Sequence, residues 1–286
     1  MAKSLSPKSR SKSVSKSKKS QGKSLQRWVV KLGTGILTTP EGRLDLEQIR
    51  KLVSQVARLR ARGIQIILVS SGAIGGGMGI LGLAKRPKAI EELQTCAAIG
   101  QPYLMSLYAE LFGKHRMHVA QILLTYFDLD SRSLYANAQK TLSHILRLDK
   151  GSYVPIINEN DVISHEEIKF GDNDQLSAHV AVMAKADRLI ILSNVPGLTE
   201  NSDGSGKAIA HVPKIDERIL SLAGKTASER SVGGMITKLT AARIANGEGI
   251  LMQIAHGRTT DVLVKIAKGD KIGTLFGELG ELKGKI

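Results

Sequence analysis

Apolar residues along this chain form short continuous runs, and these runs alternate with longer segments of helical periodicity. Within the runs apolar and polar positions do not alternate, which is typical of strands covered on both faces. The predicted strands are 28–32, 64–69, 119–124, 154–157, 188–192 and 250–254, and the predicted helices are 45–63, 91–111, 131–148 and 235–245. Strands separated by helices predict an α/β fold with a mainly parallel sheet between two helical layers.

Glycine and polar residues gather directly after several of the predicted strands. Gly33-Thr34-Gly35 follows the first strand, a glycine-rich stretch at 70–77 follows the second, and Asn158-Glu159-Asn160-Asp161 follows the strand 154–157. In open α/β sheets ligands bind at the carboxyl ends of the strands. The pattern therefore predicts a binding site at this edge of the sheet.

Several classes of protein are excluded by what the 286 residues contain. A single cysteine, Cys96, rules out an internal disulfide and a thiolate metal site. No apolar run approaches the ~18 residues of a membrane-spanning helix. No GxxxxGK[ST] motif occurs, which excludes a P-loop NTPase, and Ser71 lies outside any GxSxG nucleophile elbow. A GxGxxG does occur at 77–82, but it begins too far from its strand for a dinucleotide site.

The net charge of +15 is concentrated at the N-terminus. Residues 1–27 hold nine Lys or Arg and no acid, so the remainder carries 32 basic against 26 acidic residues. The Ser/Lys-rich segment 1–26 has too few apolar groups to form a core and predicts a disordered tail. A transit peptide and a weak polyanion-binding arm are alternatives for this tail.

Two segments have the chemistry of phosphate binding. Lys31 ends the first strand, and the glycines after it let backbone amides approach an anion. Val232-Gly233-Gly234 precedes a helix whose first turn carries Thr237 and Lys238. Free N–H groups and the positive end of the dipole make a helix N-terminus favourable for a phosphate.

The densest polar cluster combines residues 158–161 with Lys169-Phe170-Gly171-Asp172-Asn173-Asp174. Its acids and amides, separated by a short segment, can bind an ammonium, a carboxylate or a metal ion together. A solvated surface loop has a similar composition and is the alternative for this cluster.

Five motifs taken together resemble the glutamate 5-kinases of the amino-acid kinase family. They occur in the family's order at 31–34, 70–74, 157–161, 170–174 and 233–238. The similarity covers about residues 27–277, and the C-terminal PUA domain of many relatives is not expected here. The resemblance implies a three-layer αβα sandwich over 27–286, with a glutamate-binding lobe at about 27–185 and an ATP-binding lobe at about 186–286.

The resemblance also implies an activity and the residues that perform it. The activity is ATP- and Mg²⁺-dependent phosphorylation of the L-glutamate γ-carboxylate, the first step of proline biosynthesis. Lys31 and Lys238 would neutralise the transferring phosphoryl group, and Asp174 would hold both lysines. Ser71, Asp161 and Asn173 would bind glutamate. The ATP-binding residues would be Lys31, Ser193, Asn194, Val232, Gly233, Gly234, Met235, Ile236, Thr237 and Lys238, with no metal ligand assigned to the protein.

Two departures from the family pattern concern the nucleotide. Ser193-Asn194 stands where relatives commonly have Thr-Asp, and Ser231-Val232-Gly233-Gly234 stands where they have Gly-Thr-Gly-Gly. The resemblance further implies a cytoplasmic homo-oligomer, a dimer or a tetramer. Two other functions remain open: an amino-acid kinase for a different small acid, and a polyanion-binding protein whose kinase body has decayed.

Overall fold

A computed structural model describes residues 26–148, 152–164, 173–224 and 234–279. The strands are β1 (Arg27–Leu32), β2 (Gln65–Ser70), β3 (His118–Leu124), β4 (Tyr153–Glu159), β5 (Arg188–Ser193), β6 (His211–Val212), β7 (Leu251–His256) and β8 (Thr274–Phe276). The helices are α1 (Thr34–Leu37), α2 (Leu46–Arg60), α3 (Ala73–Ile80), α4 (Ile90–Gly113), α5 (Tyr126–Asp130), α6 (Arg132–Ile145), α8 (Asn173–Met183), α9 (Glu217–Ser221), α10 (Met235–Gly247) and α11 (Val262–Lys268).

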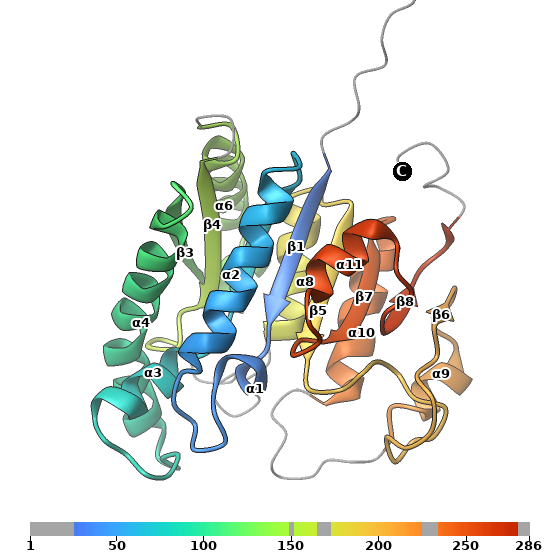
Figure 1. Cartoon of the computed structure of the whole chain (residues 1–286), viewed down its shortest axis with the longest axis horizontal. Coiled ribbons are helices and arrows are strands. Elements are labelled where there is room, and N and C mark those ends of the chain that lie inside the picture. Colours follow the sequence, from blue (N-terminus) through green and yellow to red (C-terminus); the bar gives the residue numbers. More distant parts are fainter. Residues whose placement is uncertain (1–25, 149–151, 165–172, 225–233, 280–286) are drawn as a thin grey trace, which may run out of the picture.

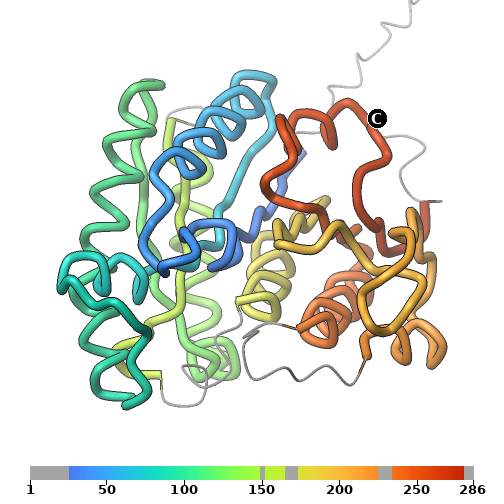
Figure 2. The backbone as a smooth tube through the Cα atoms, turned by 60° about the horizontal axis from the view of Figure 1, so that its bottom comes forward, coloured from blue at the N-terminus to red at the C-terminus, as the bar shows by residue number. Residues whose placement is uncertain are grey.

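The strands form one 8-stranded sheet in the order β3-β4-β2-β1-β5-β7-β8-β6 (Figure 1). In this order the neighbours from β3 through β4, β2, β1 and β5 to β7 all pair in parallel. Their carboxyl ends therefore meet at one edge of the sheet. In Figure 2 the blue-to-green first half of the chain lies beside the orange-to-red second half. Because β1 pairs with both β2 and β5, it joins the two halves at the centre of the sheet.

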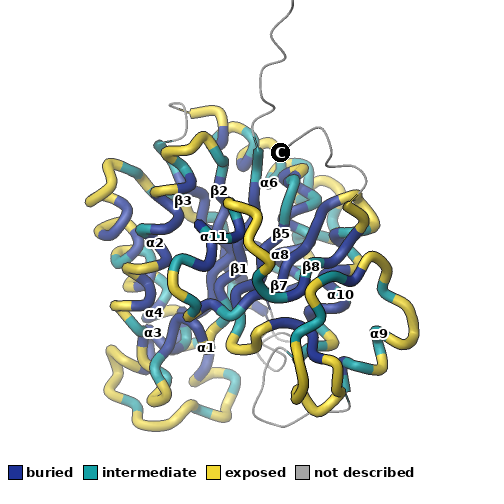
Figure 3. Tube along the Cα trace, turned by 45° about the vertical axis from the view of Figure 1, so that its right-hand side comes forward, coloured by how far each residue is buried: buried dark blue, intermediate teal, exposed yellow. Residues whose placement is uncertain are grey.

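Successive residues of each central strand face different hydrophobic cores. In β1, Val29 belongs to the core shared with α6, α8 and α10, whereas Val30 belongs to the core shared with α2, α4 and α11. Both residues are fully buried, and Figure 3 shows the strands as the dark centre of the molecule. Two buried faces explain why the sequence shows continuous apolar runs, and the arrangement confirms the predicted αβα sandwich.

The C-terminal edge of the sheet differs from the prediction. The chain returns after α11 as β8, which pairs antiparallel with β7 and parallel with the two-residue strand β6. Neither β6 nor β8 is among the strands predicted from the hydrophobic pattern. Strands of two and three residues are too short to produce a hydrophobic pattern.

The glycine-rich segment after β2 is a packing surface between two helices. Most of the GxGxxG motif lies in α3, where Gly77 packs against the backbone of Cys96 in α4. A Cβ on Gly77 would lie 1.9 Å from the Cys96 carbonyl oxygen. These glycines let the two helix backbones approach closely, a role unrelated to a dinucleotide.

The same interface predicts a large loss of stability for Gly100→Ala. Gly100 lies in α4, and a Cβ there would be 1.9 Å from the carbonyl oxygen of Ala73. Since both sides are backbone, the helices must move apart, and overpacking of this kind costs about 1–3 kcal/mol or more. Urea unfolding measures the loss. Gly113→Ala, in the same helix with nothing within 4 Å of its Cβ, is the control and should not destabilise. Equal stability of the two variants would contradict this packing.

Candidate active site

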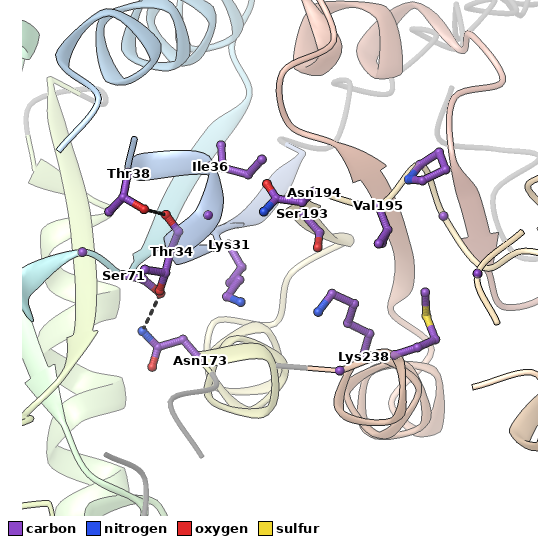
Figure 4. A pocket seen from close by; sticks show the side chains of 18 of the residues that line it. Lys31, Thr34, Ile36, Thr38, Ser71, Asn173, Ser193, Asn194, Val195 and Lys238 are labelled. Carbon is purple, nitrogen blue, oxygen red and sulfur yellow. Dashed lines mark hydrogen bonds between the residues drawn. The ribbon is translucent and has the colours of Figure 1, made fainter. Parts of the chain in front are cut away.

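A cavity of about 650 Å³ opens at the carboxyl ends of the parallel strands. It is bordered by the residues that follow β1, β2, β4 and β5, and by the first residues of α8 and α10. Figure 4 shows that side chains from these separate segments, including Lys31, Ser71, Asn173, Ser193 and Lys238, surround one space. The topology thus brings together residues that lie more than 200 positions apart in the sequence.

Two lysines and one aspartate form a buried cluster at the floor of this cavity. The Lys31 ammonium lies 2.5 Å from Oδ1 of Asp174, and the Lys238 ammonium lies 2.9 Å from Oδ2. Asp174 is 0% exposed, Lys31 5% and Lys238 4%. The hydroxyl of Thr237 also donates to Oδ2, at 3.3 Å. One carboxylate therefore holds both ammonium groups, each from a different element of the fold.

The two ammonium groups keep the carboxyl of this cluster ionised. Burial by itself raises the pKa of the Asp174 carboxyl, but the two ammonium groups outweigh burial and hold that pKa well below its usual range. The carboxylate is therefore ionised at neutral pH and is a shared partner of both lysines. Lys31 and Lys238 also line the cavity, so an anionic ligand that enters it would meet two cationic side chains.

The N-terminus of α10 provides further donors beside this cluster. Gly234 is the N-cap residue of the helix and, being a glycine, has no side chain to cap it. Gly234 and Met235 line the cavity, whereas the Ile236 side chain is 53% exposed and does not line it. Free N–H groups and the helix dipole at this end favour an anion. The predicted phosphate-loop residues Val232 and Gly233 lie outside the described residues.

A chain of amide groups fixes the opposite wall. The Asn173 amide donates to the Ser70 carbonyl at 2.7 Å, to Oδ1 of Asn158 at 2.9 Å and to the Ser71 hydroxyl at 3.3 Å. Asn158 in turn donates to Gln101 of α4 at 2.8 Å. Because the amide nitrogens of Asn173 and Asn158 both donate to defined partners, the orientation of Asn173 at the start of α8 is determined. Ser71 and Asn173, both predicted site residues, are in direct contact (Figure 4).

Two opposite charges lie on a further part of the cavity lining. Asp161 follows β4 and is half-buried, and Arg86 lies in the loop between α3 and α4. Burial raises the pKa of Asp161 to about 6, although the nearby Arg86 guanidinium lowers it. Sequence reasoning singled out Asp161 but missed Arg86, which belongs to no recognisable motif.

The segment after β5 also borders the cavity. Ser193 and Asn194 both line the cavity. Asn194 is packed so closely over Gly35 that a Cβ on this glycine would lie 2.1 Å from the Asn194 amide nitrogen. The two predicted nucleotide segments, after β1 and after β5, are therefore in contact.

Within the described ranges, no group of three or more His, Cys, Asp or Glu side chains is placed to hold a metal ion. Over the same part of the chain, no helix is both long and apolar enough to cross a membrane.

A parallel α/β sheet with buried lysines at the carboxyl ends of its strands defines a protein that binds anionic ligands there. The model of the amino acid kinase family matches residues 26–256, and the chain belongs to this family. It is 45% identical over 253 residues to a glutamate 5-kinase of Thermoanaerobacter sp. (strain X514), covering 87% of this chain and 67% of the relative. It is also 45% identical over 255 residues to a glutamate 5-kinase of Clostridium acetobutylicum, covering 88% of this chain and 94% of the relative.

Among solved structures, the fold is similar to that of the UMP kinase from Bacillus anthracis. The two superpose with a TM-score of 0.56, over 89% of this chain and 97% of that chain, at 14% sequence identity. At this identity the likeness concerns the fold alone. It agrees with the αβα architecture that the hydrophobic pattern predicted.

Proposed function

We propose that this protein transfers the γ-phosphoryl group of ATP to the γ-carboxylate of L-glutamate, forming γ-glutamyl phosphate, as the first step of proline biosynthesis. The observation that carries the proposal is the buried cluster of Lys31, Asp174 and Lys238 at the floor of the cavity. Its two ammonium groups line the cavity and suit a transferring phosphoryl group, and the glutamate 5-kinase relatives support glutamate as acceptor. The contact among these three groups argues against a kinase domain that has lost its activity.

Phosphoryl transfer requires positioning and charge stabilisation more than covalent chemistry. A carboxylate oxygen of the acceptor attacks the γ-phosphorus while the bond to the leaving oxygen of ADP breaks. The acceptor carboxylate is already ionised at neutral pH, so no general base is needed. Lys31 and Lys238, both buried, would stabilise the charge that spreads over the phosphoryl oxygens.

The described residues fit ATP and Mg²⁺ in the following way. The N-terminus of α10, with Gly234 and Met235, would bind the phosphates, and Ser193 and Asn194 would lie near the nucleoside. Thr237 would steady the cluster through Asp174, and Ile236 would contribute through its backbone. Mg²⁺ commonly keeps several waters and binds substrate phosphates together with one or two carboxylates, so it needs no cage of protein ligands. When bound with ATP, the ion neutralises phosphate charge.

Glutamate would occupy the wall formed by Ser71, Asn173 and Asp161. Hydroxyl and amide groups can bind a carboxylate, and an aspartate can bind an ammonium group. The assignment of residues 27–185 to glutamate and 186–286 to ATP follows the same division. The homo-oligomer and the cytoplasmic location stay predictions. The polyanion-binding tail does so as well, because residues 1–25 lie outside the described residues.

The test is a panel of acceptors with ATP, Mg²⁺ and hydroxylamine. Hydroxylamine attacks the acyl phosphate carbonyl, releases phosphate and leaves a hydroxamate, which gives a coloured complex when iron(III) is added. L-Glutamate should give γ-glutamyl hydroxamate, whereas aspartate and N-acetylglutamate should give far less. Turnover of either of these acids without turnover of glutamate would identify an amino-acid kinase for a different small acid.

The raised pKa of Asp161 predicts a pH dependence for glutamate binding. Only the ionised carboxylate attracts an ammonium group, and Asp161 takes up a proton as the pH falls through about 6. At saturating ATP, kcat/KM for glutamate should therefore fall about tenfold per pH unit below this value. Asp161→Asn should have a low kcat/KM without this pH dependence. If Asp161→Asn kept the pH profile of the full chain, Asp161 would not be the group that binds the ammonium.

A further inference from the structure

Of the positive side chains described along the cavity lining, Arg86 is the one that lies apart from the phosphoryl cluster. The lining includes Lys31, Lys238 and Arg86. Lys31 and Lys238 act on the pKa of Asp174, whereas Arg86 acts on the pKa of Asp161. The cavity thus has two charged regions, one at its floor and one near the loop between α3 and α4.

Arg86 and Asp161 line the same cavity without being joined to each other. No salt bridge or hydrogen bond links either side chain to another residue in the part of the chain that the structure describes. Asp161 is half-buried and Arg86 is exposed beside it, and partial desolvation lowers the pKa of Arg86 and raises that of Asp161. Two opposite charges that face one cavity and do not pair directly can both be satisfied by a ligand of the reverse polarity.

An α-amino acid has this polarity at its head group, a carboxylate beside an ammonium. On the proposed function, the γ-carboxylate lies at the phosphoryl cluster, so the head group must lie elsewhere in the cavity. The Asp161 carboxylate can accept from the ammonium, and the planar guanidinium of Arg86 can donate two parallel hydrogen bonds to a carboxylate. Lysine cannot form this bidentate contact.

We propose that Arg86 binds the α-carboxylate of the acceptor and, together with Asp161, selects a free α-amino acid over acids that lack either head group. This inference rests on the proposed function. It assigns the loop between α3 and α4 a part in substrate recognition. Loops on rigid scaffolds commonly carry such contacts.

The experiment compares three acceptors that differ by one head group at a time. L-Glutamate has both groups, 4-aminobutyrate lacks the α-carboxylate, and glutarate lacks the ammonium. Each is measured as a substrate in the hydroxamate assay, or as a competitive inhibitor against glutamate where turnover is absent. The proteins are the full chain, Arg86→Gln, Arg86→Lys, Asp161→Asn and the control Lys85→Gln. Lys85 is the exposed neighbour of Arg86 and does not line the cavity.

Arg86→Gln should lower kcat/KM for glutamate by roughly 10- to 100-fold, which is the effect of losing a hydrogen bond between charged groups. Most of this loss should be a rise in KM. Binding of 4-aminobutyrate, which has no α-carboxylate to lose, should stay unchanged. Asp161→Asn should show the complementary pattern, with weaker binding of glutamate and unchanged binding of glutarate. Arg86→Lys should fall between the full chain and Arg86→Gln, and Lys85→Gln should equal the full chain.

The outcomes separate the two proposals. If the full chain makes no hydroxamate from glutamate, the proposed function is wrong. If it does, but Arg86→Gln weakens glutamate and 4-aminobutyrate by the same factor, Arg86 supports the loop and does not contact the α-carboxylate. If Arg86→Gln left kcat/KM for glutamate unchanged, the inference would also be wrong.

Discussion

Replacing Lys238 by alanine should lower kcat by roughly 10²- to 10³-fold, the usual effect of removing one electrostatic stabiliser of a transition state. The Lys238 ammonium is buried, lies 2.9 Å from Asp174 and comes from the first turn of α10. Charge spreads over the phosphoryl oxygens as the bond to ADP breaks, so the ammonium acts more strongly on the transition state than on bound ATP. Such a loss lowers kcat and kcat/KM together. Steady-state kinetics with ATP and glutamate varied separately measure both constants.

Lys31→Ala should have an effect of the same size, because Lys31 lies on the other side of Asp174 at 2.5 Å. Lys238→Arg should also fail, since the planar guanidinium does not replace a compact ammonium in a buried site. Lys140→Ala removes an exposed lysine from the interior of α6 and is the control for charge and helix effects. A rise in the KM for ATP alone, with kcat unchanged, would make Lys238 a ground-state binding residue.

The positions of Lys31 and Lys238 at the cavity could largely be predicted from the sequence. Lys31 comes directly after an apolar run and Lys238 lies in the first turn of a glycine-preceded helix, so both were predicted at the ligand edge of the sheet. The buried strands were recognisable because burial on both faces requires continuous apolar residues. The ion pairs themselves are tertiary, since Asp174 is 143 positions from Lys31 and 64 from Lys238.

Other features were not predictable for identifiable reasons. The segment around Asn173 and Asp174 looks like a polar loop, yet these residues are buried in the first turn of α8. The polar residues of this turn obscure its helical periodicity, and the buried ion pairs offset their desolvation. The glycines of α3 are needed because the backbone of α4 packs directly against them, and this contact cannot be read from the local sequence. Arg86 lies in an exposed loop, where its charge is unremarkable until the cavity is known.

Asp174→Asn should lower kcat by roughly 10²- to 10³-fold as well, although Asp174 does not line the cavity, because both lysines depend on its charge. The amide carries no negative charge, so two buried ammonium groups would lie close together without an anion between them. Like charges and burial both disfavour the protonated form of a lysine. In Asp174→Asn one of the lysines should therefore lose its proton at a pH well below the usual value for lysine.

The pH profile of kcat distinguishes this effect from simple misfolding. In the full chain the pKa of Asp174 lies well below its usual range, so this group does not titrate between about pH 6 and pH 9. In Asp174→Asn a lysine with a lowered pKa is charged at low pH and neutral at high pH, so the residual kcat should fall as the pH rises through that range. Asp270→Asn, an exposed site, should keep the profile of the full chain. A folded Asp174→Asn variant with near-normal kcat and a flat profile would mean that the lysines hold their positions without the anion.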